Sequence, residues 1–240
     1  MLALVFASCK KASERKCFKS SGTPTTKEIA LSDFNSLLLN EHVAYELVQD
    51  SLDKVVIHGG ENLINFIECK VVDGRLEVEN KNKCAFLRAG KKDKDKIVVE
   101  IHFTDIVNIH YEGSEYLKSV GTIHSDYLTL LIRDGSGPVD MTLDSKIIYA
   151  EISHGWGDFT LRGQTESATL RVSSNGYCDV RDLLILDSAA VLSDTPGSTH
   201  LSVNGIPLTG FIKGSGNVYY SGTPSLIDVI LTNTGKLVQE

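Results

Sequence analysis

Two carboxylates and two guanidinium groups occupy repeating positions in the second half of this 240-residue chain. Asp140 and Asp179 are 39 residues apart, and Arg162 and Arg181 are 19 apart. If one turn of the chain takes about 20 residues, the aspartates lie two turns apart, about 9.6 Å at about 4.8 Å per turn. That is the outer limit for the carboxylate pair of an inverting glycoside hydrolase, and the arginines would suit a sugar acid. The same residues also suit an outer surface that is simply polar and solvated.

Aromatic side chains offer a second kind of chemistry, the stacking of a sugar on an exposed ring. Trp156, the only tryptophan, and Tyr219 are the candidates, since the neighbouring Tyr220 is expected to face inward. No histidine or cysteine spacing is typical of a zinc site, and no GxSxG phrase supplies a nucleophile. We therefore expect no metal, no cofactor and no catalytic residues.

The elements that would position these residues are set by a glycine that recurs about every twentieth residue. The repeat glycines are Gly137, Gly157, Gly176, Gly197, Gly216 and Gly235, in steps of 20, 19, 21, 19 and 19 residues. Two positions later stand Val139, Phe159, Cys178, Thr199, Val218 and Leu237. Four positions later stand Met141, Leu161, Val180, Leu201, Tyr220 and Gln239. Largely apolar residues at alternating offsets within a fixed period are typical of a β-solenoid.

The repeat predicts an all-β fold, a right-handed parallel β-helix with about 19–21 residues per turn. A βαβ crossover needs about 30 residues, so each turn must consist of strands and corners only. Each turn buries its apolar face by stacking on the next, which makes the two series above columns of core residues. The glycines are expected at corners where a positive φ or crowding excludes a side chain, because none of the phrases continues as a phosphate-binding loop into a helix.

The N-terminal half lacks this period. Alternating segments there predict strands, and Asp73-Gly74 between two of them predicts a hairpin with a type I′ turn. Residues 61–67 are the only stretch for which one or two helical turns are expected. Cys69 and Cys84 lie unsymmetrically around the hairpin, and whether they form a disulfide stays open.

The chain begins with the composition of an export signal. A short apolar run ends in Ala-Ser-Cys, which resembles a lipobox and makes Cys9 the predicted lipidation site; an ordinary, unlipidated signal is the alternative. The run is too short to span a bilayer, so membrane contact is expected only through a lipid anchor. The predicted organisation is a signal remnant and flexible tether over 1–26, an N-terminal β portion over 27–112, and regular glycine-cornered turns over 113–240.

The charge of the chain excludes one class of partner. The formal net charge is −7, and residues 1–26 carry five basic side chains and one acidic, so the remainder carries −11 by subtraction. A surface this negative repels phosphate groups. We therefore expect neither nucleic acid nor an anionic lipid surface as a partner of the folded part.

Several phrases resemble the head GIN domain family of auto-transporter adhesins. These are the FNSL, GENLI and DGRLEV segments that begin at Phe34, Gly60 and Asp73, and GSGNVYYSGTPSL over Gly214–Leu226. The last is the most specific, although Thr195-Pro-Gly and Ser174-Asn-Gly replace Gly-x-Gly in two other turns. The resemblance covers about residues 27–238. It implies a secreted or lipid-anchored β-solenoid of a Gram-negative envelope, with no catalytic residues to carry over.

Three functions are compatible with these observations. The leading one is a non-enzymatic adhesin, exported and lipid-anchored at the outer membrane, that presents a face of the solenoid to a glycan or a protein. The second is a carbohydrate-active lyase or hydrolase that uses Asp140, Asp179, Arg162 and Arg181, and it requires raised carboxylate pKa values. The third is a structural spacer or subunit that forms homo-oligomers through the open C-terminal end at Leu231–Leu237.

Overall fold

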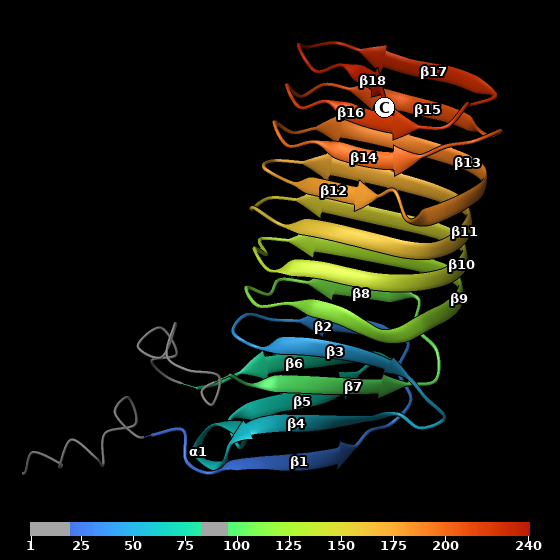
Figure 1. The fold of residues 1–240 in the computed structure, drawn as a ribbon. Helices are drawn as coiled ribbons and strands as arrows, with labels where there is room; N and C mark the ends of the chain where they lie inside the picture. Colours follow the sequence, from blue (N-terminus) through green and yellow to red (C-terminus); the bar gives the residue numbers. More distant parts are fainter. Residues whose placement is uncertain (1–19, 83–95) are drawn as a thin grey trace, which may run out of the picture.

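The computed structural model describes residues 20–82 and 96–240. These residues form one 18-stranded sheet that winds into a β-solenoid of about 7 turns (Figure 1). The predicted all-β solenoid is therefore confirmed. The predicted lipidation site at Cys9 lies outside the described residues. No helix in the described part of the chain is long and apolar enough to cross a membrane.

The strands are short in the N-terminal portion and long in the middle of the solenoid. The N-terminal elements are β1 Pro24–Ala30, β2 Ser36–Leu39, β3 Ala44–Gln49, β4 Lys54–Gly60, α1 Glu61–Ile64, β5 Ile67–Val72, β6 Arg75–Asn80, β7 Val98–Phe103 and β8 Asn108–Tyr111. The later strands are β9 Leu117–Arg133, β10 Pro138–Ser153, β11 Asp158–Ser173, β12 Tyr177–Val180, β13 Leu183–Asp194, β14 Thr199–Ser202, β15 Pro207–Ile212, β16 Val218–Ser221, β17 Leu226–Leu231 and β18 Leu237–Gln239.

Two local predictions for the N-terminal portion are confirmed. The expected helical segment is α1, a single turn. The expected hairpin joins β5 and β6, and φ is 50° at Asp73 and 74° at Gly74, as a type I′ turn requires. Among the described cysteines, Cys69 and Cys178 are free thiols. Cys84 lies outside the described residues, so its pairing stays a prediction.

The two predicted columns of residues lie in the core. The first column runs in register through the parallel pairs that join β10, β11, β12, β14, β16 and β18. From Val139 to Tyr220, no member of either column is more than 8% exposed. The alternation of the sequence thus translates directly into one buried and one outward face along each turn.

Crowding, rather than a positive φ, explains the repeat glycines. None of the six, all of which the structure describes, has a positive φ. A Cβ on Gly137 would lie 2.6 Å from the carbonyl carbon of Glu115, in the turn below, and even closer to its oxygen. A Cβ on Gly216 would meet the carbonyl group of Gly197 in the same way. At these corners the stacked backbones leave no space for a side chain.

The N-terminal strands do not stack in chain order (Figure 1). β2 and β3 pair in parallel with β6 and β7 on one side and with β8 and β9 on the other. The pairs β1–β4, β4–β7 and β5–β6 are antiparallel. The missing sequence period follows from this arrangement, because a period requires successive turns to be built from successive residues.

Candidate functional site

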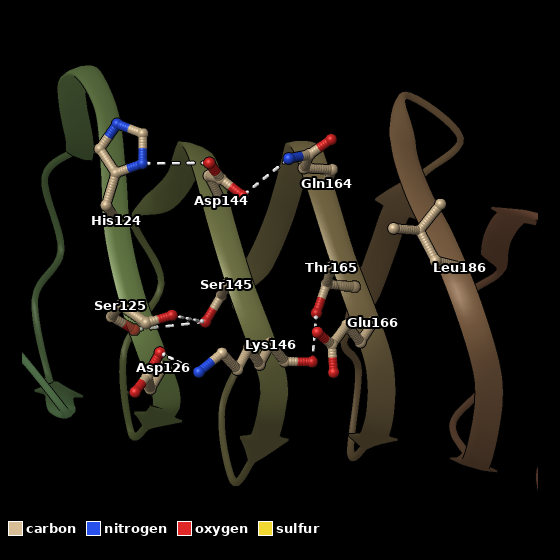
Figure 2. Close-up of a pocket in the computed structure, with 10 residues that line it drawn as sticks. All are labelled: His124, Ser125, Asp126, Asp144, Ser145, Lys146, Gln164, Thr165, Glu166 and Leu186. Carbon is tan, nitrogen blue, oxygen red and sulfur yellow. Dashed lines mark hydrogen bonds and ion pairs between the residues drawn. The ribbon is translucent and has the colours of Figure 1, made fainter.

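A polar groove of about 500 Å³ follows the outer corner of the solenoid across β9, β10, β11 and β13 (Figure 2). The corner arises because the alternation breaks: Lys146 and Ile147 are consecutive and both exposed. Three rows of side chains line the groove, and each row takes one residue from each of β9, β10 and β11. Within a row the residues are 20 positions apart in the chain.

The first row consists of His124, Asp144 and Gln164. Their Cα atoms are in register, and the Asp144 carboxylate accepts hydrogen bonds from both neighbours (Figure 2). His124 Nδ1 lies 3.1 Å from Asp144 Oδ2, and Gln164 Nε2 donates to Asp144 Oδ1 at 2.9 Å. These contacts fix the three side chains along one wall of the groove.

The second row consists of Ser125, Ser145 and Thr165 and lies at the bottom of the groove. Ser145 Oγ donates to the carbonyl oxygen of Ser125 at 2.8 Å, and Thr165 Oγ1 donates to that of Lys146 at 3.1 Å. Both of these hydroxyls belong to buried residues. Their partners are backbone carbonyl groups at the corner, so this row stabilises the corner.

The third row alternates in charge, with Asp126, Lys146 and Glu166. Lys146 Nζ lies 2.8 Å from Asp126 Oδ1, and this hydrogen bond raises the pKa of Lys146. All three residues are exposed. On β13 the exposed side chain of Leu186 lines the same groove and adds an apolar contact surface (Figure 2). This part of the groove therefore presents carboxylate, ammonium and apolar groups side by side.

The four charged residues singled out from the sequence neutralise each other. Asp140 and Asp179 share one outward column, two strands apart, as expected. Arg162 is paired with Asp140 and approaches Asp182 at 3.9 Å, whereas Arg181 Nη2 lies 2.6 Å from Asp179 Oδ2. The hydrogen bond from Arg181 holds the pKa of Asp179 below its usual value. A general acid needs the opposite shift.

The two aromatic candidates lie on different turns. Trp156 is 73% exposed at the corner before β11, and β12 and β14 separate that strand from Tyr219 on β16. The ring of Tyr219 stacks on His200, with centroids 4.8 Å apart, and His200 contacts Tyr177 at 5.7 Å. Asn217 donates to the Tyr219 hydroxyl. One face of Tyr219 is therefore covered, and the most exposed aromatic surface is that of Trp156.

None of the groove residues was among the sequence candidates. They lie between the glycine phrases, in stretches without a motif, and the only signal was their common spacing of 20 residues.

In the part of the chain that the structure describes, no group of three or more His, Cys, Asp or Glu residues could hold a metal ion. Among the described hydrogen bonds, no hydroxyl contacts the His124 ring, so the groove lacks a nucleophile–base pair.

Solved structures share this fold at low sequence identity. A "putative adhesin" from Bacteroides fragilis NCTC 9343 has a TM-score of 0.75 and 18% identity, and the match covers 91% of this chain and 97% of that one. A "putative adhesin" from Parabacteroides distasonis ATCC 8503 has a TM-score of 0.65 and 19% identity, with 90% and 98% covered. A "putative lipid binding protein" from the same organism has a TM-score of 0.59 and 16% identity, with 90% and 97% covered.

A comparison with curated proteins gives no match. A family model described as "Putative auto-transporter adhesin, head GIN domain" matches residues 33–224, which include the groove and both core columns as far as Val218 and Tyr220. The expected resemblance is thereby confirmed, and it points to an exported or envelope protein. The chain belongs to the head GIN domain family.

Proposed function

We propose that the protein is a non-enzymatic, exported adhesin that binds a glycan chain along the groove of Figure 2. The observation that carries this proposal is the repetition of hydrogen-bonding side chains in rows across three turns. Successive turns lie about 4.8 Å apart, so an extended ligand parallel to the solenoid axis meets similar groups at each step. A polymer of similar sugars presents hydroxyl groups in such a repeating manner.

The charge of the groove narrows the class of glycan. Asp126, Asp144 and Glu166 against Lys146 give a formal charge of −2 when His124 is neutral. This field disfavours uronic acids and sulfated or phosphorylated sugars. Carboxylates accept hydrogen bonds from hydroxyl and amino groups, and amides both accept and donate them, which favours neutral sugars and amino sugars as ligands. We expect the preferred ligand to belong to one of these two classes.

The Asp140–Asp179 hydrolase alternative has little support, because the pKa of Asp179 is lowered and the arginines occupy both carboxylates.

The family supports export, and we propose that Cys9 carries the lipid that holds the protein in the envelope. Cys9→Ser should abolish incorporation of a radiolabelled fatty acid and move the protein out of the membrane fraction. Unchanged labelling of the Cys9→Ser variant would refute the lipidation site.

A glycan array tests the binding proposal. The groove variants are Gln164→Ala and Glu166→Ala, which leave the backbone contacts of the corner intact, and Asp194→Asn on β13 is the matched control outside the groove. We expect saturable binding of neutral or amino sugars, reduced about tenfold or more by either groove variant and unchanged by the control. This follows because each lost hydrogen bond to a charged or polar group is worth about 1.5 kcal/mol.

Three outcomes would contradict the proposal. Binding that is lost in Trp156→Ala or Tyr219→Ala but not in the groove variants would move the site to an aromatic residue. An array without any saturable ligand would refute glycan binding. New reducing ends released from a bound glycan would refute the non-enzymatic assignment.

A further inference from the structure

The two ends of the solenoid differ in the residues that they expose. At the N-terminal end, β1 runs antiparallel to β4, pairs with no other described strand, and carries mostly polar and charged residues. At the C-terminal end, among the described strands, β17 pairs only with β15 and β18 only with β16. The outer edges of β17 and β18 therefore carry backbone N–H and C=O groups that can pair with another strand.

The C-terminal end also exposes residues that belong to the core columns. Ile227 and Leu231 are in register with Leu208 and Ile212, which are fully buried. They face inward in the same way but are 46% and 48% exposed, because no further turn among the described residues covers them. The end of the solenoid thus combines an open backbone edge with an apolar surface.

The charges at this end complement those of a second copy placed antiparallel. Lys236 and Glu240 flank β18 symmetrically about Val238, and strand alternation puts all three on one side. If the β18 strands of two copies pair in antiparallel fashion with their Val238 residues opposite each other, Lys236 of each copy lies opposite Glu240 of the other. On β17, a register centred on Val229 keeps the two Asp228 carboxylates from facing each other.

We propose that the protein forms a closed two-fold dimer in which the last turns of two copies pair in antiparallel fashion. This goes beyond the proposed binding function. Head-to-tail stacking would instead join the apolar end to polar β1 and would grow into filaments. The two-fold arrangement pairs the open edges of β17 and β18 at once, so assembly through this end stops at two copies. It also gives each particle two grooves, which strengthens attachment to a repetitive glycan through multivalency.

Sedimentation equilibrium of the 240-residue chain tests the dimer. The chain has a mass of 26.2 kDa, and we expect twice this mass at micromolar concentration. Ile227→Lys places a charge in the apolar end and should give the single-chain mass. Leu52→Lys is the matched control, because Leu52 is 66% exposed between β3 and β4 and far from this end, and it should remain dimeric.

A charge exchange separates the proposed pairing from a general loss of stability. Lys236→Glu and Glu240→Lys should each weaken the dimer on the order of tenfold, since each creates two like-charge pairs. The double exchange should restore the original dissociation constant. A single-chain mass for the unaltered protein, a dimeric Ile227→Lys variant, or a double exchange no tighter than the single ones would overturn the proposal.

Discussion

Replacing Gly216 with alanine tests whether crowding alone requires glycine at the corners. The new Cβ would lie 2.8 Å from the carbonyl carbons of Gly197 and Pro196 and closer still to the Gly197 oxygen. These atoms belong to the backbone of the turn below and cannot rotate away, so the two turns must separate at the corner. The hydrogen bond from Gly216 N to the carbonyl oxygen of Thr195, 2.8 Å long, would lengthen.

The expected loss of unfolding free energy is about 2–3 kcal/mol. Overpacking in a closely packed region costs about 1–3 kcal/mol, and a weakened backbone hydrogen bond costs about 1 kcal/mol. Alanine also stiffens the unfolded chain, which offsets about 0.4–1 kcal/mol. The matched control is Gly176→Ala, because the atoms nearest to its Cβ would be side-chain carbons of Ile152 and Val172, at 3.0 Å, rather than backbone atoms. We expect that change to stay within about 1 kcal/mol.

Urea denaturation followed by circular dichroism measures both variants. The urea concentration at the midpoint of unfolding should fall strongly for Gly216→Ala and slightly for Gly176→Ala. The slope of the unfolding free energy against urea concentration should stay unchanged. Equal losses for the two variants, or a loss below about 0.5 kcal/mol for Gly216→Ala, would refute the crowding argument, because that is the range of neutral surface substitutions.

Two further predictions concern ionisable groups. The hydrogen bond from Arg181 lowers the pKa of Asp179 from its usual value of 3.8. The ion pair therefore stabilises the fold above pH 3.8, and this stabilisation is lost as the pH falls through the pKa that Asp179 has in the folded protein. Asp179→Asn should therefore lower the melting temperature at pH 7 and not at pH 2, and an equal effect at both would contradict the assignment. Burial raises the pKa of Cys69 to about 11 and that of Cys178 well above its usual value. At pH 8, iodoacetamide should modify neither thiol in the folded protein and both in urea, as read by peptide mass spectrometry; rapid native labelling of Cys178 would contradict its burial.

The regular half of the fold could be predicted because its determinants are local. A period of about 20 residues fixes the length of a turn, and alternation within it fixes which residues face inward. The columns that contain Phe159 and Leu161 were therefore correct from the sequence alone. The same regularity explains why Asp140 and Asp179 share an outward column.

The groove could not be predicted, because it depends on how turns bend and pair. The groove exists where consecutive outward residues such as Lys146 and Ile147 break the alternation, and no motif marks that corner. The pairing of Asp179 with Arg181, two residues later, depends on side-chain conformations that the spacing leaves open.

The sequence by itself determined the repeat, the core columns and the glycine corners, since each follows from spacing along the chain. Only the tertiary structure decided that β2 and β3 are inserted between turns formed by later residues (Figure 1). It also decided that residues 20 positions apart line one groove, and that among the described strands β17 and β18 each pair on one edge only. The physical reason is that the register of two paired strands decides which residues lie side by side. Between segments that are distant in the chain, long-range packing sets this register, and the local sequence does not.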